Sequence, residues 1–240
     1  MFPARVCRVD WRSSAHPAWR FFSCFPTLAV DFPSFDVVFH FPKLPGNWLR
    51  LDSTVSLLDP TPAYVVPSKL ANLPGELIFF SMGSLFSNCL PLMKRMVAML
   101  AQLPYRFIVS KGPAGQELDP LPANCDGANF VPQRSVLGVV QLAIHHGGNN
   151  TLSECFHFGV PSLIMPLLGD QPDNAERLRD TGLGRTLNPY KVTLDELRST
   201  IADLLADTDL RKRMQQIGKR IRADNGLDWL CDELVKYLEV

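Results

Sequence analysis

The densest group of residues that could do chemistry lies between Ala143 and Pro166, in the sequence AIHHGGNNTLSECFHFGVPSLIMP. The pattern predicts a strand that ends near His146 and a helix that begins at Asn150 and Thr151. The first backbone N–H groups of such a helix have no intrahelical partner, and the helix dipole adds partial positive charge. The stretch therefore predicts a binding site for a phosphate or pyrophosphate group.

The glycines and polar side chains at this turn suit an anion that comes close to the backbone. Gly147 and Gly148 carry no Cβ atom, so a ligand can approach there. Asn150 and Thr151 can cap the helix or donate hydrogen bonds to the same oxygens. Adjacent histidines at a strand end point to opposite faces of the sheet, so we expect no metal shared between them. The residues alone also permit a simpler interpretation, a turn with an asparagine N-cap and two satisfied histidines.

Strands and helices alternate from Leu77 onward. Short apolar runs bounded by turns predict buried strands, and apolar residues at helical spacing predict the helices between them. This alternation predicts one Rossmann-like α/β domain over residues 75–240, with a parallel sheet and helices on both faces. The strands expected are 77–81, 105–110, 142–146 and 162–165, and the helices expected are 93–100, 135–140, 150–158 with a stop at Gly159, 173–181, one capped by Thr193 and Glu196, and one from Leu227.

Residues 1–74 have a different composition from the rest of the chain. Proline and aromatic residues dominate, and prolines interrupt every periodic pattern. Only short strand-like pieces appear, such as residues 36–41, and no amphipathic helix is visible. We interpret residues 1–74 as an irregular remnant of a further domain together with a linker.

Charge and cysteine content limit the classes of function. The formal net charge is zero and the sequence pI is about 6.9, which disfavours a nucleic-acid partner. No window approaches the ~20 apolar residues of a membrane span. The cysteines lack metal-ligand spacing, which indicates reduced thiols in a cytoplasmic protein and no metal site. They are Cys7, Cys24, Cys89, Cys125, Cys155 and Cys231.

Three blocks of sequence resemble a known family in their order and spacing. They are FVPQRSVL (130–137), HGGNNTLSE (146–154) and GVPSLIMPLLGDQPDNA (159–175). Together they resemble the signature of family 1 UDP-glycosyltransferases, whose two-domain architecture is called GT-B. The resemblance covers about residues 75–240 and is to the C-terminal, donor-binding domain, which implies an N-terminally truncated chain. The missing membrane span makes the chain most similar to the soluble, macrolide-transferase-like branch.

The resemblance implies a role for individual residues in binding the nucleoside. Phe130 stands where the family usually has tryptophan, whose ring stacks on uracil, and phenylalanine keeps the π face. The backbone of Val131 is implied to bond the uracil edge, and Gln133 to lie near the ribose. Glu154 matches the glutamate that accepts hydrogen bonds from the ribose hydroxyls. The residues alone also permit Phe130 to be part of the core.

Further residues are implied to bind the diphosphate and the sugar. Asp170 and Gln171 match the pair that binds sugar hydroxyls, although they could simply cap the helix that follows. Ser84, in SMGS, could likewise only shape its turn. The residues implied for the diphosphate are Ser84, His146, Gly148, Asn149, Asn150 and Thr151.

The family's reaction is the transfer of a hexose from a UDP-sugar to a hydroxyl group, with inversion and without a cofactor or metal. The resemblance implies UDP-glucose as the donor and a small lipophilic acceptor. The general base belongs to an N-terminal domain that residues 1–74 are too short to form, so we assign no catalytic residue. Two alternatives stay open, a non-catalytic UDP-sugar-binding subunit whose partner chain supplies the acceptor domain, and a truncated pseudoenzyme. An NAD-dependent oxidoreductase is disfavoured, because SMGSLF is not the dinucleotide glycine pattern.

Overall fold

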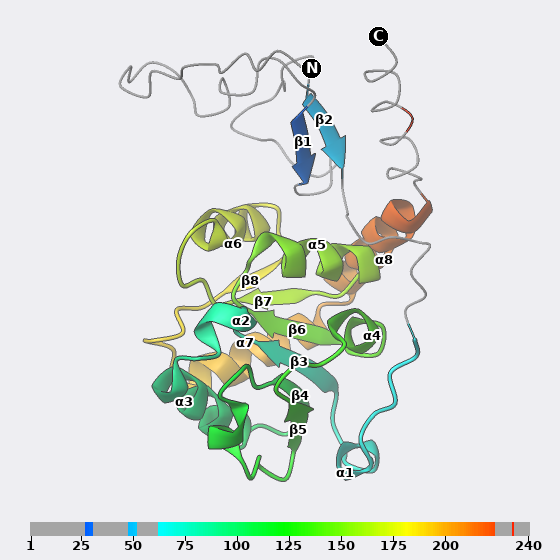
Figure 1. Cartoon of the computed structure of the whole chain (residues 1–240). Coiled ribbons are helices and arrows are strands. Elements are labelled where there is room, and N and C mark those ends of the chain that lie inside the picture. Colours follow the sequence, from blue (N-terminus) through cyan, green and yellow to red (C-terminus); the bar gives the residue numbers. More distant parts are fainter. Residues whose placement is uncertain (1–26, 31–47, 52–61, 224–231, 233–240) are drawn as a thin grey trace, which may run out of the picture.

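The computed structural model describes residues 27–30, 48–51, 62–223 and 232 (Figure 1). Its main body is a six-stranded sheet in the order β5-β4-β3-β6-β7-β8. Every strand pair in this sheet is parallel. The strands are β3 (Leu77–Ser81), β4 (Arg106–Ser110), β5 (Cys125–Ala128), β6 (Leu142–His145), β7 (Ser162–Ile164) and β8 (Gly184–Thr186).

Helices cover both faces of this sheet, as the alternation predicted (Figure 1). Ile78 and Phe80 of β3 belong to one core cluster with residues of α3 and α7, whereas Leu77 and Phe79 belong to another with residues of α1 and α4. The predicted fold class is therefore confirmed. The helices are α1 (Ser68–Ala71), α2 (Gly83–Phe86), α3 (Leu90–Leu100), α4 (Gln133–Leu137), α5 (Asn149–Phe158), α6 (Gln171–Asp180), α7 (Leu194–Ala206) and α8 (Thr208–Ala223), with a 3₁₀ turn at Gly115–Leu118.

The chain order reverses at the centre of the sheet, which decides where a ligand can bind. From β3 the chain runs outward through β4 to β5, and it then returns so that β6 pairs with the other side of β3. In open parallel sheets, the loops after the two central strands diverge at such a point and leave a crevice at their carboxyl ends. The loops after β3 and β6 carry Ser84 and His146, which the sequence predicted to lie near a diphosphate.

Helix ends agree with the sequence in some places and differ in others. The predicted capping box is present, because the Thr193 hydroxyl accepts from the Glu196 N–H while the Glu196 carboxylate accepts from the Thr193 N–H. The stop of α5 at Gly159 is confirmed by its left-handed conformation. The N-cap of α5 is Gly148 rather than an asparagine, since the helix begins one residue earlier than predicted.

Several elements of the described chain were not predicted, among them β8 and α8. β8 consists of Gly-Arg-Thr, which has neither the length nor the apolar residues of a recognisable strand. α8 does carry a readable signal, because its buried residues recur at helical spacing. They are Leu210, Met214, Ile217 and Ile221.

Part of the segment before residue 75 contributes to the core of the domain. Leu70 of α1 is completely buried, and Tyr64 and Val66 pack against the cluster to which Leu70 belongs. Further towards the N-terminus, β1 (Thr27–Val30) and β2 (Trp48–Leu51) form a separate parallel pair. The strand expected at 36–41 and the helix expected from Leu227 lie outside the described residues, and the domain boundary at residue 75 stays a prediction. None of the helices in the described part of the chain is long and apolar enough to cross a membrane.

Two glycines with nearly the same backbone conformation allow the packing around α5 to be tested. Gly159 has φ of 71° and Gly169 has φ of 68°. A Cβ at Gly159 would lie 2.9 Å from the Met214 carbonyl oxygen in α8, whereas one at Gly169 would meet nothing within 4 Å. We expect Gly169→Ala to cost about 1–2 kcal/mol, because only backbone strain is added. Gly159→Ala should cost a further ~1–3 kcal/mol from overpacking, measured by urea unfolding. Equal costs would show that α5 and α8 adjust freely.

Candidate functional site

A cavity of about 430 Å³ opens at the carboxyl ends of the central strands. Its wall comes from the ends of β3, β4 and β6, the loop before α4 and the start of α5. This is the crevice expected where the chain order reverses. The lining residues are Ser81, Gly83, Ser84, Ser87, Ser110, Gly112, Phe130, Val131, Gln133, His146, Gly148, Asn149, Asn150 and Thr151.

The structure brings most of the predicted site residues together around this cavity. Every one of them lines it except Glu154, Asp170 and Gln171. Further serines line the cavity that were not predicted as site residues, among them Ser81 and Ser110. A signal existed, because both residues end strands that are paired in register. Neighbouring parallel strands place their last residues at the same edge of a sheet.

The imidazole of His146 lies between two glycines. A Cβ added at Gly83 would come within 2.7 Å of the ring's Cε1, and one added at Gly148 within 2.5 Å of its Nε2. Any larger residue at either position would therefore displace the ring. The ring's Nδ1 is buried and has no hydrogen-bond partner among the described residues. His146 is thus held in place by packing, with hydrogen-bonding capacity to spare.

Burial also sets the charge of His146. Desolvation lowers the pKa of this imidazole, although the Asp170 carboxylate opposes the shift. A lowered pKa leaves the ring neutral at pH 7, so that one ring nitrogen donates and the other accepts. A neutral His146 can therefore give one hydrogen bond to an anionic oxygen.

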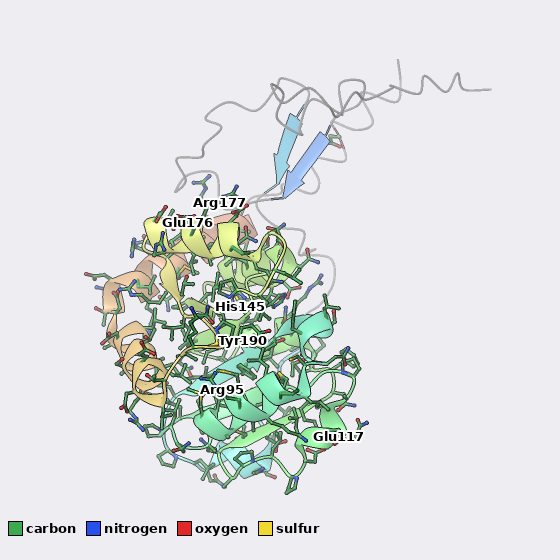
Figure 2. The ribbon with its side chains drawn as sticks, turned by 90° about the vertical axis from the view of Figure 1, so that its left-hand side faces the viewer. Arg95, Glu117, His145, Glu176, Arg177 and Tyr190 are labelled. Atoms are coloured by element: carbon green, nitrogen blue, oxygen red, sulfur yellow. The ribbon has the colours of Figure 1, made fainter. Side chains whose placement is uncertain are left out.

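The neighbouring His145 has a structural role. Its side chain is completely buried inside the domain (Figure 2), and its ring lies at 82° to that of His146. Its Nδ1 accepts from the Gly147 N–H at 3.1 Å, and its Nε2 lies 3.8 Å from the Cys155 sulfur. Accepting at Nδ1 places the proton on Nε2. His145 thus fixes the start of the turn that holds the cavity-lining residues.

Phe130 lines the cavity, and Glu154 lies beside it through a bond to the lining residue Gln133. The Phe130 side chain is 67% exposed, so the alternative that it packs in the core is wrong. The Glu154 carboxylate accepts from Gln133 Nε2 at 2.6 Å and lies 3.4 Å from Arg134 Nε. Glu154 is therefore connected to the cavity through Gln133, which lines it.

Asp170 and Gln171 begin α6 and do not simply cap it. The Asp170 side chain makes no capping bond to its own helix, and its Oδ2 instead accepts from the Asn149 N–H of α5 at 3.2 Å. Gln171 is buried, and its Oε1 accepts from the N–H groups of Leu167 and Leu168 at 2.8 and 3.2 Å. Its carbonyl oxygen therefore holds the loop before α6.

The polar groups of the cavity favour an anion. Hydroxyls, amides and the neutral His146 line it, and none of the described lining residues is a carboxylate. The N-terminus of α5, a helix whose N-cap Gly148 has no side chain, borders the cavity, and its first backbone N–H groups have no acceptor within the helix. The described part of the chain contains no cluster of three or more potential metal ligands. The arrangement suits phosphate oxygens bound by backbone and side-chain donors.

The sheet order and the helices on both faces define the C-terminal domain of the GT-B glycosyltransferase fold. A model of the family described as "Erythromycin biosynthesis protein CIII-like, C-terminal domain" matches residues 94–239, and the chain belongs to this family. The glycosyltransferase resemblance predicted from the three sequence blocks is thereby confirmed.

Individual relatives are glycosyltransferases. The sterol 3-beta-glucosyltransferase of Komagataella phaffii is 26% identical over 208 residues, which cover 83% of this chain and 16% of the relative. The NDP-glycosyltransferase YjiC of Bacillus licheniformis is 32% identical over 123 residues, which cover 51% of this chain and 31% of the relative. The solved structure of the glycosyltransferase VinC, in complex with DTDP, is 25% identical with a TM-score of 0.63. The match covers 80% of this chain and 52% of VinC. The chain thus spans less than half the length of the curated relatives and about half of this solved one.

The burial of His145 predicts a pH dependence of stability. Desolvation, reinforced by His146, holds the pKa of His145 at about 3, against 6.5 for an unburied histidine. The unfolded chain binds the extra proton between these values, so stability falls as the pH drops from about 6.5 towards 3. His145→Asn keeps an acceptor for the Gly147 N–H but cannot titrate. Between about pH 6 and 4, we expect the free energy of unfolding of the unmodified chain to fall by about 1.4 kcal/mol more per pH unit than that of His145→Asn. Urea unfolding of both proteins across this pH range measures the difference. The prediction is wrong if their free energies of unfolding change in parallel with pH.

Proposed function

We propose that the chain binds a UDP-sugar in this cavity and supplies the donor-binding half of a glycosyltransferase. The observation that carries the proposal is the wall free of carboxylates, on which His146 and the N-terminus of α5 face the same space as the exposed ring of Phe130. Such a wall offers donors for a diphosphate and a flat apolar surface for a base. Family membership supports the proposal.

The donor extends along the cavity in a defined order. The uracil stacks on Phe130 and bonds the backbone of Val131, while the ribose hydroxyls donate to Glu154 beside Gln133. The diphosphate lies against His146 and the first turn of α5, with Ser84 on the other side. The sugar hydroxyls reach Asp170 and Gln171 at the start of α6.

The reaction that we propose is a displacement at the anomeric carbon. An acceptor hydroxyl attacks this carbon, a new C–O bond forms with inversion, and the bond to the diphosphate breaks with its electron pair leaving on UDP. Negative charge then grows on the phosphate oxygens, where the α5 amides and His146 stabilise it without moving. The acceptor proton goes to a general base that belongs to the acceptor-binding half of the complete enzyme.

The relatives support the proposed binding of a nucleoside diphosphate more strongly than the identity of its base or of the sugar. One is an NDP-glycosyltransferase, and one solved structure holds DTDP. UDP-glucose as donor, a small lipophilic acceptor and a cytoplasmic location remain parts of the proposal. The described cysteines Cys89, Cys125 and Cys155 are free thiols, which suits a reducing compartment.

The role of Phe130 can be tested against a matched aromatic residue. Phe130 is 67% exposed and Tyr190, on the loop after β8, is 59% exposed, but only Phe130 lines the cavity. Phe130→Ala should weaken UDP binding about 5- to 100-fold, because stacking of a base contributes ~1–3 kcal/mol. Tyr190→Ala should leave the dissociation constant unchanged. Calorimetric titration with UDP measures both. No UDP binding by the unmodified chain, or equal effects of the two variants, would contradict the proposal.

Glu154 should distinguish ribose from deoxyribose. An ionised carboxylate accepts from both ribose hydroxyls, whereas dTDP lacks the 2′-hydroxyl. Glu154→Gln retains the shape and removes the charge. We expect UDP binding to weaken about tenfold, since a hydrogen bond to a charged group contributes ~1.5–3 kcal/mol, and dTDP binding to weaken less. Titration of both nucleotides into both proteins measures this. An equal loss for both nucleotides would show that Glu154 only supports Gln133 and Arg134.

A further inference from the structure

The Asp170 carboxylate lies beside the cavity, at the start of α5. Oδ2 of Asp170 accepts from the backbone N–H of Asn149 at 3.2 Å and from Nδ2 of Asn174 at 3.0 Å. Asn149 lines the cavity and is the first residue of α5. The carboxylate therefore occupies one of the helix N–H groups that would otherwise be free for a diphosphate.

The cap on α5 comes from a distant residue because the helix has none of its own. Its N-cap is Gly148, which has no side chain, and Asp170 lies 21 positions after Asn149 in the chain. A carboxylate at this end of a helix is favoured by the unpaired N–H groups and by the helix dipole. Asp170 thus stabilises the start of α5 while no nucleotide is bound.

A buried amide holds the Asp170 carboxylate in this position. The Asn174 side chain is only 4% exposed, and its Nδ2 donates both to Asp170 Oδ2 and, at 2.9 Å, to the Gly147 carbonyl oxygen. Asn174 therefore connects α6 to the turn between β6 and α5. Because these bonds fix the carboxylate, Asp170 cannot turn away from the helix end without breaking them.

This position has opposite consequences for a nucleoside diphosphate and for a nucleotide sugar. A free diphosphate brings its full negative charge towards the fixed carboxylate, and like charges at short range repel. A nucleotide sugar carries less charge on its diphosphate, and its hydroxyls can donate hydrogen bonds to a carboxylate. Asp170 therefore opposes binding of the nucleoside diphosphate more than binding of the nucleotide sugar.

We propose that Asp170, held by Asn174 over the start of α5, makes the site favour the complete donor over the product nucleoside diphosphate. This inference rests on the proposed function of the cavity. In the empty protein the carboxylate caps α5, and in the donor complex the sugar hydroxyls compensate its charge. After transfer no sugar hydroxyl remains, so the carboxylate and the product repel each other and release is promoted.

The test compares two variants that each remove one negative charge from the start of α6. Asp170→Asn keeps an oxygen that can accept from Asn149 and Asn174. Asp173→Asn removes the charge of an exposed carboxylate in the first turn of α6. UDP and UDP-glucose are titrated calorimetrically into the whole chain and both variants at one fixed ionic strength, because salt screens such interactions. Asp170→Ser, which also removes the charge, is the second variant if Asp170→Asn does not fold.

We expect Asp170→Asn to bind UDP about three- to tenfold more tightly and UDP-glucose no more tightly than the unmodified chain. Asp173→Asn should change neither dissociation constant by more than about twofold. If the unmodified chain binds both ligands and Asp170→Asn does not tighten UDP binding, this inference is wrong and the proposed function stands. It is also wrong if Asp173→Asn tightens UDP binding equally. If the unmodified chain binds neither ligand, the proposed function fails and the inference with it.

Discussion

The site depends on one constraint, the backbone N–H groups at the start of α5, which have no acceptor within their own helix and lie at the carboxyl edge of the sheet. A helix that starts there must satisfy these groups from outside itself, because its N-cap Gly148 has no side chain. In the structure the carboxylate of Asp170 satisfies the first of them. The others face a cavity whose described wall carries no competing negative charge. The end of one helix therefore supplies hydrogen-bond donors for the anion that we propose to bind here.

The two adjacent histidines have different roles, because His145 supports the turn from inside the domain and His146 lines the cavity. Strand alternation turns His145 into the core and His146 towards the cavity. His145 is neutral and accepts from the Gly147 N–H, so it fixes the turn from behind. His146 is held by two glycines that leave just enough room for its ring. The absence of a side chain at Gly148 is therefore needed for the position of the His146 ring and not only for the approach of a ligand, since a side chain at Gly148 would move the ring.

Much of this arrangement could be predicted from the sequence, because its signals are local. The turn at His146–Thr151 combines a strand end, glycines and a helix start within a few residues, and the capping box at Thr193 is equally local. The contributions of Ser81 and Ser110 depend on strand pairing, and the bonds of Asn174 reach 27 residues back to Gly147. The two serines could have been found as the last residues of two predicted strands, whereas the contacts of Asn174 have no signature in a single sequence. β8 was missed because pairing with β7, rather than its own residues, makes it a strand.

The location of the cavity fits the proposed separation of donor binding from acceptor chemistry. Its lining residues all lie between Ser81 and Thr151, within one continuous sheet and its loops. The core that supports them includes Leu70 and continues to α8, so the described part of the chain forms the cavity without any other domain. Asp170 at the start of α6, which we propose to bind the sugar, accepts from Asn149 of the cavity wall. In the proposed function, this domain alone therefore holds the nucleotide, while the attacking hydroxyl reaches the sugar from beyond it.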